Sequence, residues 1–155
     1  MSVKINTKVK KFKVSATNEL EIDSTDLIGK SYVIYFYPKD NTPGCTQEGE
    51  DFRDLYKEFK KLKTEIYGVS RDSLKSHEGF KKKYKYPFEL ISDAEEKLCN
   101  LFDVIKEKNM YGKKYMGIER STFLVNAEGV IVCEWRNVKV KGHVEEVLEK
   151  VKSIQ

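Results

Sequence analysis

The chain has 155 residues, which suits one domain with one hydrophobic core over residues 1–155. Hydrophobic residues make up 39% and charged residues 35%, and the formal net charge is +4. No apolar run approaches the roughly 18 residues that a membrane span needs, so we expect no membrane insertion. The N-terminal segment, residues 1–17, is basic but has no apolar stretch, so a secretory signal is not predicted and a cytoplasmic protein is expected.

Lysines gather in three clusters, at residues 8–13, 57–63 and 81–85. Such clusters are typical of solvated helix faces, and a basic patch for nucleic acid or an acidic partner is the alternative. No nucleic-acid-binding motif accompanies them. We therefore expect solvated surfaces, with neither nucleic acid nor a membrane as a partner.

The first half of the chain predicts short strands near residues 11–14 and 19–22, followed by a turn at residues 24–27. The continuous apolar run at residues 31–37 is typical of a central strand that is buried on both faces. A helix is predicted for residues 45–61, because apolar side chains recur there at helical spacing. These side chains are Phe52, Leu55, Tyr56, Phe59 and Leu62.

A second core strand is predicted at residues 65–70, followed by a lysine-rich helix at 73–85 and a return into the sheet at 86–91. Ser92-Asp93-Ala94-Glu95 matches a capping box, which predicts the start of another helix. The expected inner positions of the lysine-rich helix are Leu74, Phe80 and Tyr84, and those of the next helix are Leu98, Leu101, Phe102 and Ile105.

The last third predicts a loop at residues 106–117, a hairpin of strands at 121–125 and 130–135, and an amphipathic helix at 143–154. Strands thus alternate with helices, and a hairpin comes late in the chain. This order indicates an α/β fold, a three-layer sandwich with a central mixed sheet.

The most informative residue is Cys45, which follows the strand break at Pro38 and the turn Thr42-Pro43-Gly44. It falls in the first turn of the predicted helix. There the sulfur faces unpaired backbone N–H groups and the positive end of the helix dipole. Both favour the thiolate, which is the reactive form of cysteine.

The neighbours of Cys45 suit a site for a developing negative charge. The hydroxyl of Thr42 can turn toward the sulfur or toward a bound oxygen. Arg120, at the start of a predicted strand, is the candidate cation, because its guanidinium stays charged and presents a planar fork of donors. Glu48 lies one helical turn after Cys45 and either holds that arginine or is an ordinary acid in the first turn of a helix.

The pattern Pro38-x-x-x-Thr42-x-x-Cys45, with Arg120 farther along, resembles the active site of the peroxiredoxins. The amino-acid sequence of residues 36–46 is similar to that of the peroxiredoxin Q branch, also called bacterioferritin comigratory protein. The similarity covers nearly the whole chain beyond about residue 10. Further matching segments are residues 52–54, 68–70, 90–93, 117–124 and the C-terminal helix.

This resemblance implies a thioredoxin-like fold and a thiol peroxidase. Cys45 would be the peroxidatic cysteine, which attacks hydrogen peroxide or an organic hydroperoxide and becomes a sulfenic acid. Thr42, backbone N–H groups and Arg120 would stabilise the leaving oxygen. No metal or other cofactor is needed, because the sulfur carries the electrons.

The chain departs from this branch at both familiar positions of the resolving cysteine, where it has Glu50 and Lys81. Two other cysteines remain. Cys99 either packs beside an apolar helix stripe or acts as an unusual resolving thiol. Cys133 alternates with apolar residues on a predicted strand, which favours core packing. We therefore expect a one-cysteine cycle in which thioredoxin, glutaredoxin or a small thiol reduces Cys45, in a protein that is a monomer.

Other functions are less well supported by the residues. A disulfide oxidoreductase usually needs a C-x-x-C pair, which the chain lacks. A peroxide sensor without turnover would share the reactive cysteine. His77 and His143 could serve a Cys-His hydrolase or a metal, but they are far apart in the sequence and lie in polar segments. We expect both histidines at the surface and no metal site.

Overall fold

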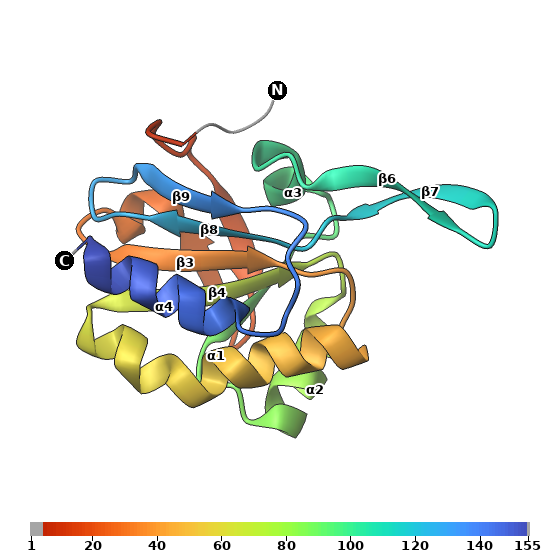
Figure 1. Ribbon diagram of the computed structural model, residues 1–155, viewed down its shortest axis with the longest axis horizontal. Coiled ribbons are helices and arrows are strands. Elements are labelled where there is room, and N and C mark those ends of the chain that lie inside the picture. Colours follow the sequence, from red (N-terminus) through yellow and green to blue (C-terminus); the bar gives the residue numbers. More distant parts are fainter. Residues whose placement is uncertain (1–4, 155) are drawn as a thin grey trace.

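The computed structural model describes residues 5–154, so residues 1–4 and 155 of the predicted domain lie outside the described part. Seven strands form one mixed sheet in the order β2-β1-β5-β4-β3-β8-β9, and β6 pairs with β7 in a separate hairpin (Figure 1). The strands are β1 (Lys13–Ala16), β2 (Leu20–Asp23), β3 (Ser31–Phe36), β4 (Thr64–Ser70), β5 (Glu89–Ser92), β6 (Ile105–Met110), β7 (Lys113–Ile118), β8 (Ser121–Val125) and β9 (Ile131–Trp135).

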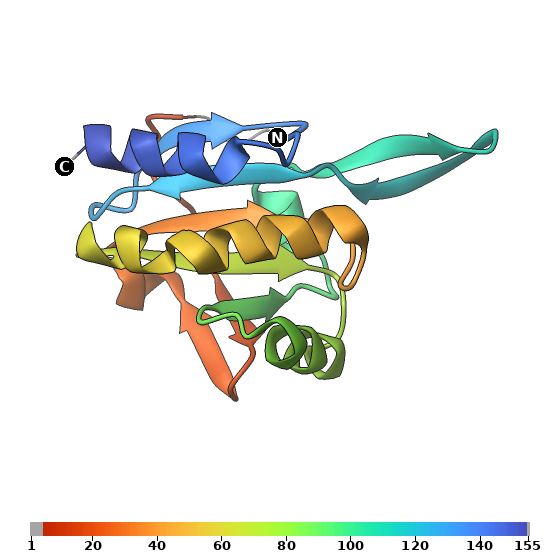
Figure 2. The same ribbon diagram turned by 60° about the horizontal axis from the view of Figure 1, so that its bottom comes forward.

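The helices lie on both faces of the large sheet. They are η1 (Ser24–Leu27), α1 (Pro43–Lys61), α2 (Leu74–Tyr84), α3 (Lys97–Leu101) and α4 (His143–Ser153). Side chains of α1, α2 and α4 share one apolar cluster, whereas η1 and α3 contribute to the cluster on the other face. In Figure 2, α1 and α4 lie side by side over the sheet. The predicted three-layer α/β sandwich with a mixed sheet is confirmed.

Strand β3 runs through the middle of the sheet, parallel to β4 and antiparallel to β8. Alternate side chains of the strand serve the two cores: Tyr32, Ile34 and Phe36 pack on the α3 face, and Val33 and Tyr35 pack beneath α1. All five of these side chains are buried. The apolar run therefore forms a strand that is covered on both faces, as predicted.

The helix at residues 92–105 is the first expectation that proves wrong. Ser92 is the last residue of β5, and its hydroxyl donates to the carbonyl of Asp72. Instead, the carboxylate of Asp93 accepts hydrogen bonds from the backbone N–H groups of Leu98 and Cys99. The helix α3 is consequently only five residues long, and Ile105 already belongs to β6.

The expected loop at residues 106–117 is also wrong, because this segment forms the hairpin of β6 and β7. Tyr111 and Gly112 make the turn, both with positive φ, which is the geometry that favours tight two-residue hairpins. Most side chains of the hairpin are at least partly exposed. Without one buried face, the sequence lacks the alternation of apolar and polar residues by which strands are predicted.

No helix within residues 5–154 is both long enough and apolar enough to cross a membrane.

Tyr86, which lies just before β5, packs closely against α1 at Gly49. This contact yields a stability prediction. A Cβ on Gly49 would overlap the hydroxyl group of Tyr86, which donates to the carbonyl of Thr46. We expect Gly49→Ala to lower the free energy of unfolding by roughly 1–3 kcal/mol, as measured by urea denaturation. The matched control is Gly79→Ala in α2, where nothing lies within 4 Å of the added Cβ. This control should be neutral or stabilising, and equal losses in both variants would contradict the steric explanation.

Candidate active site

Cys45 lies in the first turn of α1, just beyond the end of β3. Pro43 begins the helix, where its missing N–H costs no intrahelical hydrogen bond. The first N–H groups of the helix are left without intrahelical partners and lie next to the cysteine. Only 2% of the Cys45 surface is exposed. The sulfur is therefore shielded from bulk water, at the end of the helix where backbone N–H groups lack intrahelical partners.

Arg120 lies between β7 and β8, and its side chain reaches the sulfur of Cys45. Its Nη2 atom donates to the sulfur of Cys45 at 3.4 Å, and its Nη1 atom donates to Oε1 of Glu48 at 2.6 Å. A Cβ on Gly44 would approach Nη2 to 3.1 Å, so the glycine gives the guanidinium room. The structure thus brings together the cysteine, the arginine and the glutamate that the sequence analysis selected.

The carboxyl group of Glu48 is completely buried. Arg120 binds one of its oxygens, while Oε2 has no hydrogen-bond partner among the described residues. Burial raises the pKa of Glu48 to about 7, although Arg120 opposes this shift. Burial also acts to lower the pKa of Arg120, but Glu48 and Cys45 outweigh it, and the guanidinium stays charged.

Thr42 and Pro38 shape the loop before α1. Thr42 is the N-cap residue, and its hydroxyl donates to the carbonyl of Lys39 at 2.8 Å and not to the sulfur. Its proton is thereby committed, but the hydroxyl oxygen keeps lone pairs that can accept a hydrogen bond. The backbone N–H of Tyr37 donates to the carbonyl of Val69 in β4. Pro38 is the next residue, where the chain leaves the sheet.

The surface placement predicted for His77 is wrong, because its side chain is completely buried. Its Nε2 lies 2.9 Å from the carbonyl oxygen of Ile91 and must carry a proton, since a carbonyl only accepts. Its Nδ1 lies 2.7 Å from Oδ2 of Asp40, which belongs to the loop before α1. Asp40 also accepts from the hydroxyls of Tyr37 and Ser76. This network joins α2 and β5 to the loop that leads to Cys45.

Sequence reasoning missed this network, although a signal was available. His77 lies three residues before Phe80 and therefore shares its inward helix face, while the expected inner residue Leu74 is 38% exposed. Asp72 joins Asp40 and His77 in a group whose possible ligand atoms lie within 4.8 Å of one another. Hydrogen bonds within the protein already engage these groups, including one from the N–H of Asp40 to Asp72.

The surface placement of His143 is wrong as well. Its Nε2 lies 2.8 Å from the hydroxyl oxygen of Thr122, and its ring packs edge-on against Trp135. Burial lowers the pKa of His143 to about 4, so the ring is neutral at pH 7. It ties the start of α4 to β8, the strand that follows Arg120.

The other cysteines lie in different surroundings. Cys99 is fully buried in the cluster on the α3 face, opposite the cluster that contains Cys45. Burial raises the pKa of the Cys99 thiol, and Asp93 raises it further. Cys133 packs at the edge of the Cys45 cluster, and burial raises its pKa too. Both environments favour the thiol, the less reactive form.

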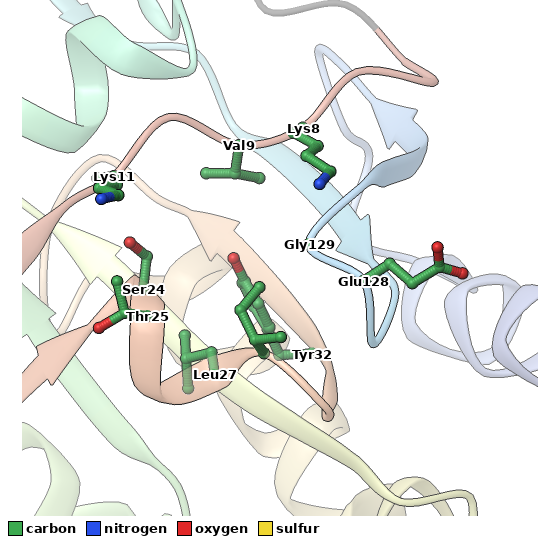
Figure 3. A pocket seen from close by; sticks show the side chains of 10 residues that line it. Lys8, Val9, Lys11, Ser24, Thr25, Leu27, Tyr32, Glu128 and Gly129 are labelled. Atoms are coloured by element: carbon green, nitrogen blue, oxygen red, sulfur yellow. The ribbon is translucent and has the colours of Figure 1, made fainter.

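A separate hollow of about 170 Å³ lies near η1, between the N-terminal segment and the β8–β9 turn (Figure 3). Tyr32, at the start of β3, lines it, so the hollow lies toward the opposite end of this strand from Cys45. None of the residues proposed for the site lines this hollow.

Comparison with known proteins decides the family. The model of the AhpC/TSA family matches residues 5–133. The chain belongs to this family. Peroxiredoxin Bcp of Xanthomonas campestris is 59% identical over 125 residues, covering 81% of this chain and 78% of the relative. Peroxiredoxin Bcp of Bacillus subtilis is 47% identical over 154 residues, covering 99% and 98%. The expected membership of the peroxiredoxin Q, or Bcp, branch is confirmed.

Solved structures agree with this assignment. Xylella fastidiosa PrxQ superposes with a TM-score of 0.94 at 43% identity, covering 99% of this chain and 98% of that one. A structure of the Xanthomonas campestris bacterioferritin comigratory protein, studied for its alkyl peroxide reduction activity, gives 0.88 at 52% identity, covering 92% and 90%. The thioredoxin-like fold expected from the sequence is confirmed.

The buried carboxyl group of Glu48 predicts a pH-dependent stability. A pKa raised from 4.5 to about 7 means that the folded protein binds this proton more tightly than the unfolded chain does. The free energy of unfolding should therefore fall, by roughly 3 kcal/mol, as the pH rises through this window. Glu48→Gln should lack this fall when both proteins are unfolded with urea at pH 5 and pH 8.

A Cys45→Ser background in both proteins prevents titration of the neighbouring thiol from contributing. Parallel stability profiles for the two proteins would show that Glu48 does not titrate in this window.

Proposed function

We propose that this chain is a thiol peroxidase that reduces hydrogen peroxide and organic hydroperoxides. The observation that carries the proposal is the charged guanidinium of Arg120, 3.4 Å from a cysteine sulfur in the first turn of a helix. Both features place positive charge beside the atoms that carry negative charge during attack on a peroxide. The peroxiredoxin names of its relatives and the alkyl peroxide reduction studied in one of them support the same activity.

The oxidative step follows from this geometry. The thiolate of Cys45 attacks the terminal oxygen of the hydroperoxide, so that an S–O bond forms while the O–O bond breaks. Negative charge moves from the sulfur to the departing oxygen, which leaves as water or an alcohol after taking up a proton. Arg120 and the N–H groups of the first turn already face this region, so they stabilise that charge without rearranging.

Three other residues position the reacting groups. Glu48 holds the guanidinium of Arg120 through the 2.6 Å hydrogen bond, and Pro38 directs the loop out of the sheet. The hydroxyl of Thr42 donates a hydrogen bond to the backbone carbonyl of Lys39, so its oxygen accepts a hydrogen bond from the peroxide O–H and orients the substrate. The role of Thr42 in this proposal is that of an acceptor, not a donor to the sulfur.

The reductive half of the cycle uses an external thiol. Cys99 is separated from Cys45 by the sheet, and a disulfide needs Cα atoms within about 7 Å. We therefore propose a one-cysteine cycle and no resolving role for Cys99. Thioredoxin, glutaredoxin or a small thiol restores Cys45. The cycle needs no cofactor, and we propose that a monomer carries it out in the cytoplasm, where reduced thiols are abundant.

Replacement of the reactive cysteine tests the proposed activity. Cys45→Ser should abolish peroxide consumption, because serine has no thiolate to attack the O–O bond. Cys133→Ser is the matched control and should keep most of the activity, since Cys133 lies at the edge of the core on β9. Peroxide consumption is followed with excess dithiothreitol. Turnover that survives in Cys45→Ser would refute the mechanism.

Intact mass after one equivalent of hydrogen peroxide tests the one-cysteine cycle. The chain should gain one oxygen, and trapping with a sulfenic-acid reagent should map it to Cys45. A loss of two hydrogens would instead show an intramolecular disulfide. Mapping that disulfide to Cys99 or Cys133 would overturn the one-cysteine cycle while leaving the peroxidase activity intact.

A further inference from the structure

The hairpin of β6 and β7 extends well beyond the rest of the molecule (Figures 1 and 2). It carries four lysines and one glutamate between residues 105 and 118. It also holds half of the large hydrophobic side chains that are exposed in the described part of the chain. These are Met110, Tyr111, Tyr115 and Met116, with exposed fractions of 55%, 98%, 42% and 55%. Basic and apolar groups are thus presented together on one projecting element.

The base of this hairpin lies beside the active site. Both figures show it at the same end of the molecule as the start of α1. Only Glu119 separates the end of β7 from Arg120, and Arg71 donates to the carbonyl of Met116 at this base. Burial lowers the pKa of Lys108, Arg120 lowers it further, and Cys45 opposes both effects. The Lys108 ammonium is therefore within electrostatic reach of the site.

One face of the hairpin continues outward from the site. Lys108 pairs with Tyr115, and Met110 pairs with Lys113, so these four side chains share a face. We call them the hairpin face. A Cβ on Gly117 would lie 3.1 Å from the ring of Tyr115 and 3.3 Å from Cδ of Lys108, so the glycine allows both side chains to pack over the strand.

We propose that the hairpin face is the docking surface for a protein reductant whose surface around its dithiol is acidic and partly apolar. The inference rests on the proposed function. Because Cys45 is only 2% exposed, a thiol on a protein reaches it only when the two surfaces meet closely around the sulfur. The hairpin enlarges the surface available for that contact. Its lysines attract an acidic partner, and its tyrosine and methionine supply apolar contacts.

The reaction in this complex balances without another reagent. A thiolate of the reductant attacks the sulfenic sulfur of Cys45, forming an S–S bond and releasing the oxygen as water after protonation. The second thiol of the reductant then attacks the reductant's own sulfur in this mixed disulfide and breaks its bond to Cys45. Cys45 leaves as a thiolate, and the reductant leaves as a disulfide. Two electrons pass from the dithiol to the sulfur of Cys45.

The test compares a protein reductant with a small thiol. Thioredoxin with its reductase, glutaredoxin with glutathione, and dithiothreitol are each used as electron donor for the parent chain and for Met110→Ser/Lys113→Glu. Neither position belongs to the proposed catalytic site. Lys30→Glu is the charge-matched control, because Lys30 is exposed and precedes β3 at the end far from Cys45.

The hairpin variant should lose roughly tenfold in kcat/KM for the protein reductant at low salt, and this loss should shrink as salt is added. The rate with dithiothreitol and the rate of sulfenic acid formation should stay within about twofold of the parent, because a small thiol needs no docking surface. Lys30→Glu should behave like the parent with every donor.

Three results of the turnover assays would overturn the docking surface alone. They are an unchanged kcat/KM for the protein reductant, an equal loss with dithiothreitol, and turnover of the parent with dithiothreitol but with neither protein. A parent dimer that the hairpin variant loses in sedimentation velocity would assign the face to a second copy of the chain, which also overturns the proposal. Failure of the parent with every donor would instead defeat the proposed function.

Discussion

The guanidinium of Arg120, shared between the sulfur of Cys45 and the carboxyl group of Glu48, is the contact on which the site depends. It requires a helix that begins at Pro43, so that Cys45 and Glu48 are one turn apart on the same side of α1. Gly44 leaves room for it, since a Cβ at this position would approach Nη2 of Arg120 to 3.1 Å. A buried carboxyl group with one unpaired oxygen is destabilising by itself. Its presence is understandable because it holds the guanidinium that donates to the sulfur of Cys45.

The rest of the fold holds the two sides of this contact at a fixed separation. Strand β3 leads into the loop before Cys45, and its antiparallel neighbour β8 begins next to Arg120. Two buried histidines connect the surroundings: His77 binds the loop through Asp40, and His143 binds β8 through Thr122. The active-site loop is therefore anchored to α2 and β5, and the strand after Arg120 is anchored to α4, although the loop itself has no regular structure.

Much of this arrangement could be predicted from the sequence, because the buried apolar residues of a helix or strand form a recognisable pattern. The apolar run of β3 and the helical stripe of α1 were both recognisable, and so was the reactive position of Cys45 at their junction. The hairpin was missed because it has no buried face. The capping box at Ser92 misled because a short polar motif matches by chance, and Asp93 caps α3 from a tighter turn instead. The histidines were misjudged from their polar neighbours, since the partners that bury them are distant in the sequence.

The placement of Cys45 and Cys99 against opposite faces of the sheet has a kinetic consequence. In the proposed cycle, recovery of oxidised Cys45 is a second-order process, because no thiol of the same chain is held close to it. Its rate then scales with the concentration of the external donor. When that donor is scarce, the sulfenic acid survives long enough to meet another peroxide and pass to the sulfinic acid, which simple thiols do not reverse. The fraction of inactivated chains would thus record past episodes in which the amount of peroxide exceeded the supply of reducing equivalents.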